Sequence, residues 1–178
     1  SAHIAWYRYQ APRETAFIAQ RMDELRAKGS KTTLHYRWVP YARISVQLKR
    51  AMIAAEDAKF AEHDGFDWEG IEKALEKNRK KGRVVAGGST ITQQLAKNLF
   101  LSPTKSYWRK GGEAVVTVLL ETMLPKQRIF ELYLNVIEWG DGVFGAEAAA
   151  QRYFGVSAAQ LSAEQAARLA AMTPSPRA

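Results

Sequence analysis

Apolar residues recur at the spacing of an α-helix along most of the chain, and a glycine or proline ends most of these runs. The clearest case is the segment 126–139, which follows a proline and precedes Gly140. Its apolar residues fall on one helical face: Ile129, Leu132, Tyr133, Val136 and Ile137. A chain patterned in this way buries its apolar faces by packing helix against helix. We therefore expect a mostly helical protein.

Capping signals support further helices. Ser45 can cap a helix start, and the pairs Thr90 with Gln93 and Ser162 with Gln165 have capping-box spacing. Segment 33–39 alternates apolar and polar residues, so it predicts a short strand that ends at Pro40. The other expected helices lie before Gly29, after Ser45, in 68–78, from Thr90, and in 107–124, 145–154 and 162–172.

Length and composition narrow the class of protein. The chain has 178 residues, of which 47% are hydrophobic and 25% charged, as expected for one folded domain rather than a disordered chain. It contains no cysteine, so disulfides, thiolate metal sites and cysteine nucleophiles are excluded. No stretch approaches the roughly 18 consecutive apolar residues of a membrane-spanning helix.

Positive charge is concentrated in one part of the sequence. The net charge is +8, and the window 77–112 holds nine lysines and arginines with no acidic residue. A balance of this kind favours an anionic partner, such as a phosphorylated substrate, a membrane surface or a nucleic acid. The nine residues are Lys77, Arg79, Lys80, Lys81, Arg83, Lys97, Lys105, Arg109 and Lys110.

Glu56 is the first candidate for chemistry. It follows Met52 by four residues and Leu48 by eight, so its carboxylate lies on or beside an apolar helix face. A carboxylate in that position can transfer protons, although a glutamate at the rim of a helix, paired with a lysine, fits the same pattern. His63 lacks a partner at the four-residue spacing of a helical zinc site, so no metal site is predicted.

The segment Gly87-Gly-Ser-Thr-Ile-Thr-Gln-Gln-Leu-Ala-Lys-Asn98 is the second candidate. Two glycines allow a close approach of the backbone to a ligand, and a helix N-terminus follows, which suits an anionic oxygen. An ordinary capped helix after a glycine pair remains the alternative. The spacing of a nucleotide-binding P-loop is absent.

Arg109, Lys110 and Glu113 form the third candidate. Their three- and four-residue spacing is compatible with a surface ion pair, or with a second carboxylate held by cations that also face a phosphate. In the second interpretation, Glu56 and Glu113 are two carboxylates around an anion-binding cleft.

Together these motifs resemble the peptidoglycan glycosyltransferases: the transglycosylase domains of class A penicillin-binding proteins and the monofunctional biosynthetic transglycosylases. Glu56-Asp57-x-x-Phe60-x-x-His63-x-Gly65 resembles the first family motif, and segment 87–98 the second. The third, fourth and fifth are resembled by Arg109-Lys110-x-x-Glu113, by Arg128-Ile129-x-Glu131-x-Tyr133-Leu134-Asn135, and by the stretch from Gly145 to Leu169. The resemblance covers roughly 39–176. No penicillin-binding domain follows, so the chain is similar to the monofunctional type.

The resemblance implies a lysozyme-like helical fold with a large globular lobe and a smaller, membrane-facing lobe. It implies residues 39–178 as a single glycosyltransferase domain with a truncated C-terminus, after a membrane-proximal segment, 1–38. The implied reaction polymerises lipid II. The 4-hydroxyl of the lipid II GlcNAc attacks MurNAc C1 of the growing chain with inversion, and undecaprenyl pyrophosphate leaves.

Site residues are carried over from the family motifs position by position. Glu56 matches the catalytic base and Glu113 the second glutamate, which orients the cations or the sugar. Lys105 stands where many members have arginine, so its charge is kept and bidentate phosphate contact is lost. The residues expected to bind substrate are Asp57, Phe60, His63, Ser89, Thr90, Gln93, Gln94, Lys97, Lys105, Arg109, Lys110, Asn135 and Tyr153.

Cofactors, partners and location follow from the same resemblance. No cofactor is required, while a divalent cation, magnesium or manganese, assists at the pyrophosphate in some members. The expected partners are lipid II, the growing glycan strand, the membrane lipid surface and other cell-wall synthesis proteins, and not nucleic acid. The expected location is the outer, periplasmic face of the cytoplasmic membrane, with the single-pass anchor missing from this chain.

Two other classes of function fit parts of the sequence. A lysozyme-like, glycan-cleaving enzyme would use Glu56 as a general acid, but it has no need of the pyrophosphate site expected between Ser89 and Arg109. A basic nucleic-acid-binding module would need stacking aromatics among its charges, and segment 77–83 has none.

Overall fold

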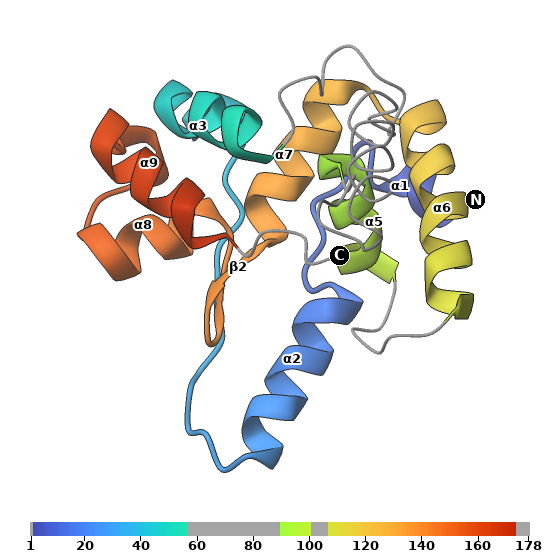
Figure 1. Ribbon diagram of the computed structural model, residues 1–178, viewed down its shortest axis with the longest axis horizontal. Helices are drawn as coiled ribbons and strands as arrows, with labels where there is room; N and C mark the ends of the chain where they lie inside the picture. The colour runs from blue at the N-terminus through green and yellow to red at the C-terminus, as the bar shows by residue number, and fades with distance from the viewer. Residues whose placement is uncertain (1, 57–89, 101–106, 174–178) are drawn as a thin grey trace, which may run out of the picture.

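The structure is a computed structural model that describes residues 2–56, 90–100 and 107–173. It is mostly helical, as the sequence predicts (Figure 1). The α-helices are α1 (Ala2–Trp6), α2 (Ala16–Ala27), α3 (Val46–Glu56), α5 (Ile91–Phe100), α6 (Tyr107–Met123), α7 (Lys126–Val136), α8 (Ala146–Phe154) and α9 (Ala163–Met172). Two 3-10 helices, η1 (Tyr41–Arg43) and η3 (Ala158–Gln160), and the strands β1 (His35–Tyr36), β2 (Glu138–Gly140) and β3 (Val143–Phe144) complete the described elements.

Helix α7 forms the centre of the larger hydrophobic core. Its side chains Ile129, Leu132, Tyr133 and Val136 are fully buried, and the helix packs against α5, α6 and α8. In Figure 1, α7 runs between the group of α3, α8 and α9 and the pair α5 and α6. The apolar stripe predicted in segment 126–139 therefore faces this core.

Helices α3 and α9 lie side by side and run in the same direction. At one end, the Ser45 hydroxyl caps α3 by accepting from the backbone N–H of Gln47 at 3.1 Å, and it donates to the Leu161 carbonyl, just before α9, at 2.8 Å. At the other end, Glu56 closes α3 and contacts Thr173, the residue that follows α9. The packing of α3 on α9 thus sets where Glu56 lies.

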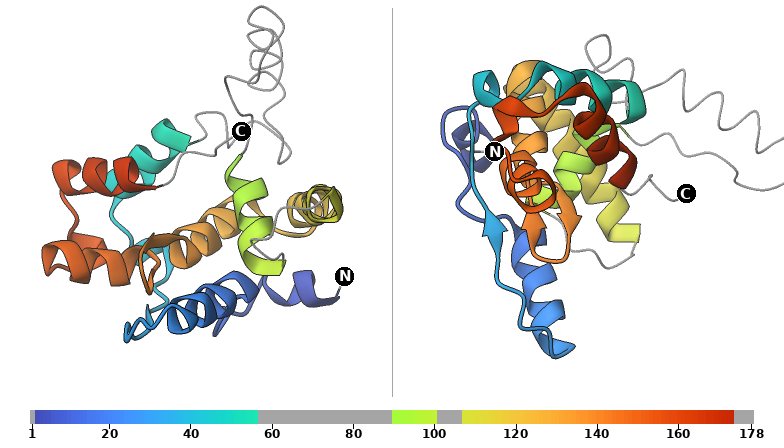
Figure 2. Two further views of the ribbon diagram at one scale, coloured as in Figure 1. Left: turned by 60° about the horizontal axis from the view of Figure 1, so that its bottom comes forward. Right: turned by 90° about the vertical axis from the view of Figure 1, so that its left-hand side faces the viewer.

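A smaller hydrophobic cluster joins α2 to the three-stranded sheet. Ile18, Met22 and Leu25 of α2 pack with Phe144 of β3, and both Ile18 and Phe144 are fully buried. The strand order is β1-β3-β2, with β1 parallel and β2 antiparallel to β3. Figure 2 shows α2 beside this sheet at the edge of the molecule.

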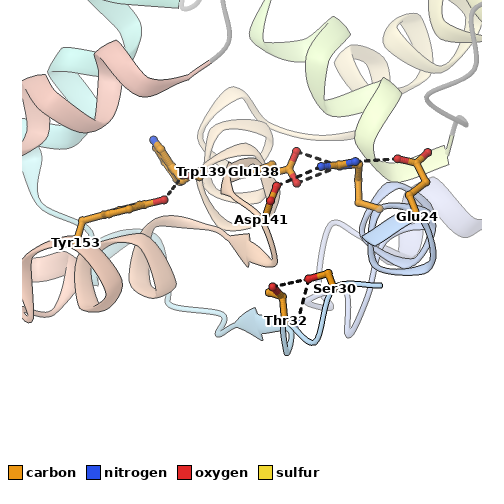
Figure 3. Close-up of polar contacts among 8 residues, drawn as sticks. Glu24, Ser30, Thr32, Glu138, Trp139, Asp141 and Tyr153 are labelled. Atoms are coloured by element: carbon orange, nitrogen blue, oxygen red, sulfur yellow. Dashed lines mark hydrogen bonds and ion pairs between the residues drawn. The ribbon is translucent and has the colours of Figure 1, made fainter. Parts of the chain in front are cut away.

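Arg21 adds a polar contact between α2 and the sheet. Its Nε donates to both carboxylate oxygens of Glu138 at 3.3 and 3.1 Å, and its Nη1 donates to Glu24 at 2.8 Å (Figure 3). Asp141 lies 3.6 Å from the same guanidinium. The side chain therefore ties α2 to β2 and to the turn that follows β2.

Two predicted elements are longer than the observed ones. The expected strand 33–39 pairs only over His35–Tyr36. The expected helix 126–139 ends at Val136, because Glu138 and Gly140 pair with β3 instead. Trp139 then turns into the core, where its indole N–H donates to the Leu169 carbonyl at 2.8 Å. Helix α1 was not predicted.

Within the described residues, no helix combines the length and the apolar character needed to cross a bilayer. The segment 68–78, which the sequence predicts as a helix, lies outside the described part of the chain.

Candidate active site

Glu56 lies at the C-terminal end of α3, half-buried, with a hydrogen bond to each carboxylate oxygen. Its Oε1 accepts from the Thr173 hydroxyl at 2.6 Å. Its Oε2 accepts from the Gln94 amide Nε2 at 3.4 Å, a long and weak contact. The carboxylate is thus held between α9 and α5, with one oxygen more firmly bonded than the other.

Tyr133 orients the side-chain amide of Gln94 from the side opposite Glu56. The Tyr133 hydroxyl donates to Gln94 Oε1 at 3.3 Å, and Tyr133 is fully buried in α7. With Oε1 used in this way, the NH₂ end of the amide faces Glu56. A line of hydrogen bonds therefore runs from α7 through α5 to the carboxylate at the end of α3.

The start of α5 has the capping box that the sequence predicts. The Thr90 hydroxyl accepts from the Gln93 backbone N–H at 3.2 Å, and Gln93 Oε1 accepts from the Thr90 backbone N–H at 2.8 Å. Thr90 is fully buried. These two side chains thus have a structural task here, and the expectation that they also bind substrate stays a prediction.

Lys97 lies one turn beyond Gln94 on α5. Residues 90, 94 and 97 are spaced by four and three, so Lys97 shares the helix face on which Gln94 contacts Glu56. Its side chain is half-buried. The arrangement brings a positive charge to the same side of α5 as the carboxylate.

The second predicted carboxylate, Glu113, lies half-buried in α6, the helix packed against α5. Its backbone carbonyl accepts from the Thr117 hydroxyl at 2.7 Å. Arg109 and Lys110 belong to the first turn of the same helix, and their side chains lie outside the described part. Five predicted site residues also fall outside it: Asp57, Phe60, His63, Ser89 and Lys105.

The stretch 128–135 ties α7 to the N-terminal part of the chain. Arg128 Nε donates to the Tyr7 carbonyl at 2.7 Å, and the Arg128 guanidinium lies 5.1 Å from the centre of the Trp38 ring. Glu131 pairs with Arg128 at 2.6 Å and accepts from the Tyr41 backbone N–H at 2.7 Å. These contacts fix the chain that leads into α3.

Asn135 belongs to the same set of contacts. Its Oδ1 accepts from the Val39 N–H at 2.9 Å, and its Nδ2 donates to the Val39 carbonyl at 2.9 Å and the Glu131 carbonyl at 2.8 Å. The side chain is fully buried. Asn135 thus bonds both backbone groups of Val39, as a neighbouring strand would. Its expected contact with substrate stays a prediction.

Tyr153 lies on α8, away from the contacts around Glu56 that the structure describes. Its hydroxyl donates to the Trp139 carbonyl at 2.6 Å (Figure 3). The ring also lines an open hollow of about 460 Å³ together with Lys31, Thr33 and Arg152. The expectation that Tyr153 contacts substrate stays a prediction.

Two residues of this arrangement are not among the site residues predicted from the sequence. Tyr133 was placed in the apolar stripe of its helix, and its hydroxyl gives no periodic signal. Thr173 lies 117 residues from Glu56 in sequence, so no local pattern connects the two. Within the described ranges, no three His, Cys, Asp or Glu side chains are placed to hold a metal ion.

Comparison with known proteins identifies the family. The family model described as Transglycosylase matches residues 22–178. The chain belongs to the transglycosylase family. A protein of Dechloromonas aromatica (strain RCB) named biosynthetic peptidoglycan transglycosylase is 69% identical over 166 residues, which are 93% of this chain and 72% of that protein.

Two further relatives carry the same name. The Herminiimonas arsenicoxydans protein is 62% identical over 98% of this chain and 75% of its own length. The Aromatoleum aromaticum protein is 60% identical over 98% of this chain and 76% of its own length. The resemblance found in the sequence motifs is therefore confirmed at the level of the family.

Proposed function

We propose that this transglycosylase polymerises lipid II into glycan strands with Glu56 as the general base. The single observation that carries the proposal is the setting of Glu56: a carboxylate at the end of α3, on the side of α5 that holds Gln94 and Lys97. The family and the names of the relatives support peptidoglycan as the substrate class.

The reaction exchanges one bond at the sugar for another. Glu56 takes the proton of the GlcNAc 4-hydroxyl, and the oxygen attacks C1 of the MurNAc at the end of the growing chain. The bond between C1 and the pyrophosphate oxygen breaks, and the pyrophosphate leaves with the electron pair. Attack opposite the leaving group inverts the configuration at C1, so an α linkage becomes a β linkage.

The leaving group gains negative charge as it departs. Lys97, with Ser89, Lys105 and Arg109 from the predicted motifs, supplies positive charge and hydrogen-bond donors to it. Glu113 orients these cations. In this proposal the chain's own cations stabilise the departing pyrophosphate, and a divalent cation bound there would supply additional positive charge.

A lipid-linked substrate requires access to the membrane surface. Trp6, the last residue of α1, is 48% exposed, and Tyr9 in the turn that follows is 75% exposed. On α6, against which α1 packs, Val115 is 60% and Val118 49% exposed. Tryptophan and tyrosine are favoured at the level of lipid headgroups. We propose that this side meets the outer face of the cytoplasmic membrane, where other cell-wall synthesis proteins also work.

The decisive experiment is the variant Glu56→Gln in an assay with labelled lipid II, with the products separated by size. We expect long glycan strands from the wild type and none from the variant, because an amide does not take up the proton. Glu164→Gln is a matched control, since Glu164 is exposed and pairs only with Arg168 at 2.9 Å among the described contacts.

Polymer from Glu56→Gln at a rate near that of the wild type would remove Glu56 as the base. Release of fragments from a preformed glycan by the wild type would instead support the hydrolase that the sequence left open. The family and the names of the relatives do not favour that alternative.

A further inference from the structure

We propose that Thr173 is a positioning residue for Glu56, and that its hydroxyl selects Oε2 as the oxygen that receives the proton. The inference rests on the proposed role of Glu56 as the general base. It concerns a residue that lies outside the sequence motifs and outside the predicted set of site residues.

The geometry of the contact is the first argument. Thr173 Oγ1 lies 2.6 Å from Glu56 Oε1, the length of a strong hydrogen bond from a hydroxyl to a carboxylate. Thr173 is buried, with 7% of its surface exposed, so little water competes for this bond. The Gln94 bond to the other oxygen is 3.4 Å long. Glu56 Oε2 is therefore the oxygen with more capacity left to accept a proton.

The Thr173 hydroxyl has two acceptors within reach and one proton to donate. Thr173 Oγ1 also lies 2.7 Å from the Ala170 carbonyl at the end of α9. That carbonyl would ordinarily accept from the backbone N–H of residue 174, which is a proline and has none. A carboxylate is the stronger acceptor, so the hydroxyl donates to Glu56 while Glu56 is ionised.

This arrangement changes with the protonation of the base. Once Glu56 has taken a proton, its oxygens accept less strongly, and the Thr173 hydroxyl can rotate to the Ala170 carbonyl. The hydroxyl thus has an acceptor both before and after the proton transfer, so no buried donor is left unpaired. In this proposal Thr173 acts through the carboxylate, which makes it a positioning residue.

The position of Thr173 is itself held rigidly. Thr173 follows α9, and α9 is packed along α3 and bonded to Trp139 through the Leu169 carbonyl. A carboxylate at the last residue of a helix has few backbone neighbours to restrain it. The end of α9 supplies the restraint that α3 lacks at this residue.

Thr173→Val tests the inference, because valine matches threonine in shape and lacks only the hydroxyl. The backbone at this position, with φ −65° and ψ 133°, is compatible with valine. We expect kcat for lipid II polymerisation to fall about 10- to 100-fold with KM within about twofold of the wild type, since a mispositioned base slows the chemical step. Thr173→Ser keeps the hydroxyl and should restore kcat to within about threefold.

Thr122→Val is the matched control. The Thr122 hydroxyl donates to the Val118 carbonyl of its own helix at 2.8 Å, so this variant loses a bond of the same kind as the one from Thr173 to Ala170. Its kcat should stay at the wild-type value. Thr173→Ala replaces Thr173→Val if the valine variant does not fold, as judged by circular dichroism.

The outcomes separate this inference from the proposed function. A wild-type kcat in Thr173→Val, with Glu56→Gln inactive in the same assay, would overturn the role of Thr173 and leave Glu56 as the base. A Thr173→Ser variant as slow as Thr173→Val would also overturn it. Activity in Glu56→Gln would overturn the proposed function, and this inference with it.

Discussion

A glutamine side chain carries an acceptor at one end and donors at the other, so its use depends on which neighbour claims which end. Gln94 is a case of this kind. Tyr133 donates to its oxygen and leaves the NH₂ group for Glu56. If the amide turned over, its oxygen would face a carboxylate, and the two acceptors would repel each other. At the scale of single residues, the buried Tyr133 therefore orients the NH₂ group of Gln94 towards Glu56.

Tyr133→Phe removes the hydroxyl that orients the Gln94 amide and keeps the ring in the core. We expect kcat for polymerisation to fall about 3- to 10-fold and the free energy of unfolding to drop by about 1 kcal/mol, the usual contribution of one buried hydrogen bond. Kinetics with labelled lipid II and urea unfolding measure the two effects.

Tyr36→Phe is the control for this change. The Tyr36 hydroxyl donates to the Pro12 carbonyl at 2.5 Å, and the Tyr36 ring packs against the smaller hydrophobic cluster between α2 and the sheet. It should lose similar stability with kcat unchanged. Equal kcat in the two variants would contradict the orienting role of Tyr133.

At the scale of elements, α6 carries opposite properties on its two sides. Thr117 and Leu120 are fully buried, while Val115 and Val118 are exposed. A helix in a protein surrounded only by water would normally present polar side chains at exposed positions such as 115 and 118. The exposed valines are therefore the part of α6 that the proposed contact with lipid explains.

The double variant Val115→Asp, Val118→Asp tests that contact. We expect its sedimentation with phosphatidylcholine vesicles to fall at least about threefold relative to the wild type, because each aspartate opposes burial among apolar chains. Zwitterionic vesicles are used because the net charge of +8 would bind anionic lipid by itself.

Val46→Asp is the matched control, since Val46 is 51% exposed on α3. Its sedimentation should equal that of the wild type. Unchanged sedimentation of the α6 double variant would argue against α6 as the membrane-facing helix.

At the scale of the whole molecule, a large helical core and a smaller cluster under α2 are joined partly by the ion pairs of Arg21. Burial raises the pKa of Glu138 above its ordinary value, and the nearby Arg21 charge only partly opposes this effect. The folded protein therefore binds the Glu138 proton more tightly than the unfolded chain does. The stability linked to this group is present at low pH and is lost as the pH rises through the raised pKa.

Glu138→Gln isolates this contribution. We expect the wild type to lose stability relative to the variant as the pH rises from about 4.5 towards neutrality, because only the wild type must ionise a partly buried carboxyl. Urea unfolding of both proteins at several pH values measures the difference. A difference that is constant with pH, or that moves in favour of the wild type, would contradict the direction of the shift.

Local signals predicted much of the helical structure. The starts of α5 and α9 lie where the capping pairs place them, because a cap acts within three residues. The end of α7 was placed too late, since the helical pattern continues into Ile137 while strand pairing with β3 decides the fold there. Strand β3 begins three residues after β2 ends, and the Asp141-Gly142 pair between them is a typical hairpin turn, so a local signal was present that the helical pattern obscured.

The residues of the candidate site also divide into those that local sequence signals predict and those that they do not. Glu56 and Gln94 could be found from helical spacing and from the motifs, and the structure brings them into contact. Thr173 could not be found, because its partner lies on another helix and its own neighbours show no pattern around it. The arrangement of the residues between 57 and 89 lies outside the described part of the chain.

The parallel packing of α3 and α9 has a consequence for protein synthesis. The ribosome completes Glu56 long before Thr173, and the two must meet for the carboxylate to be held as described. A nascent chain that has emerged only as far as α8 already contains the base and the start of α5, yet it lacks the helix that restrains the base. The restraint on Glu56 therefore forms only after nearly all of the described chain has left the exit tunnel, so the last of the described helices to be made is the one that fixes a residue made early.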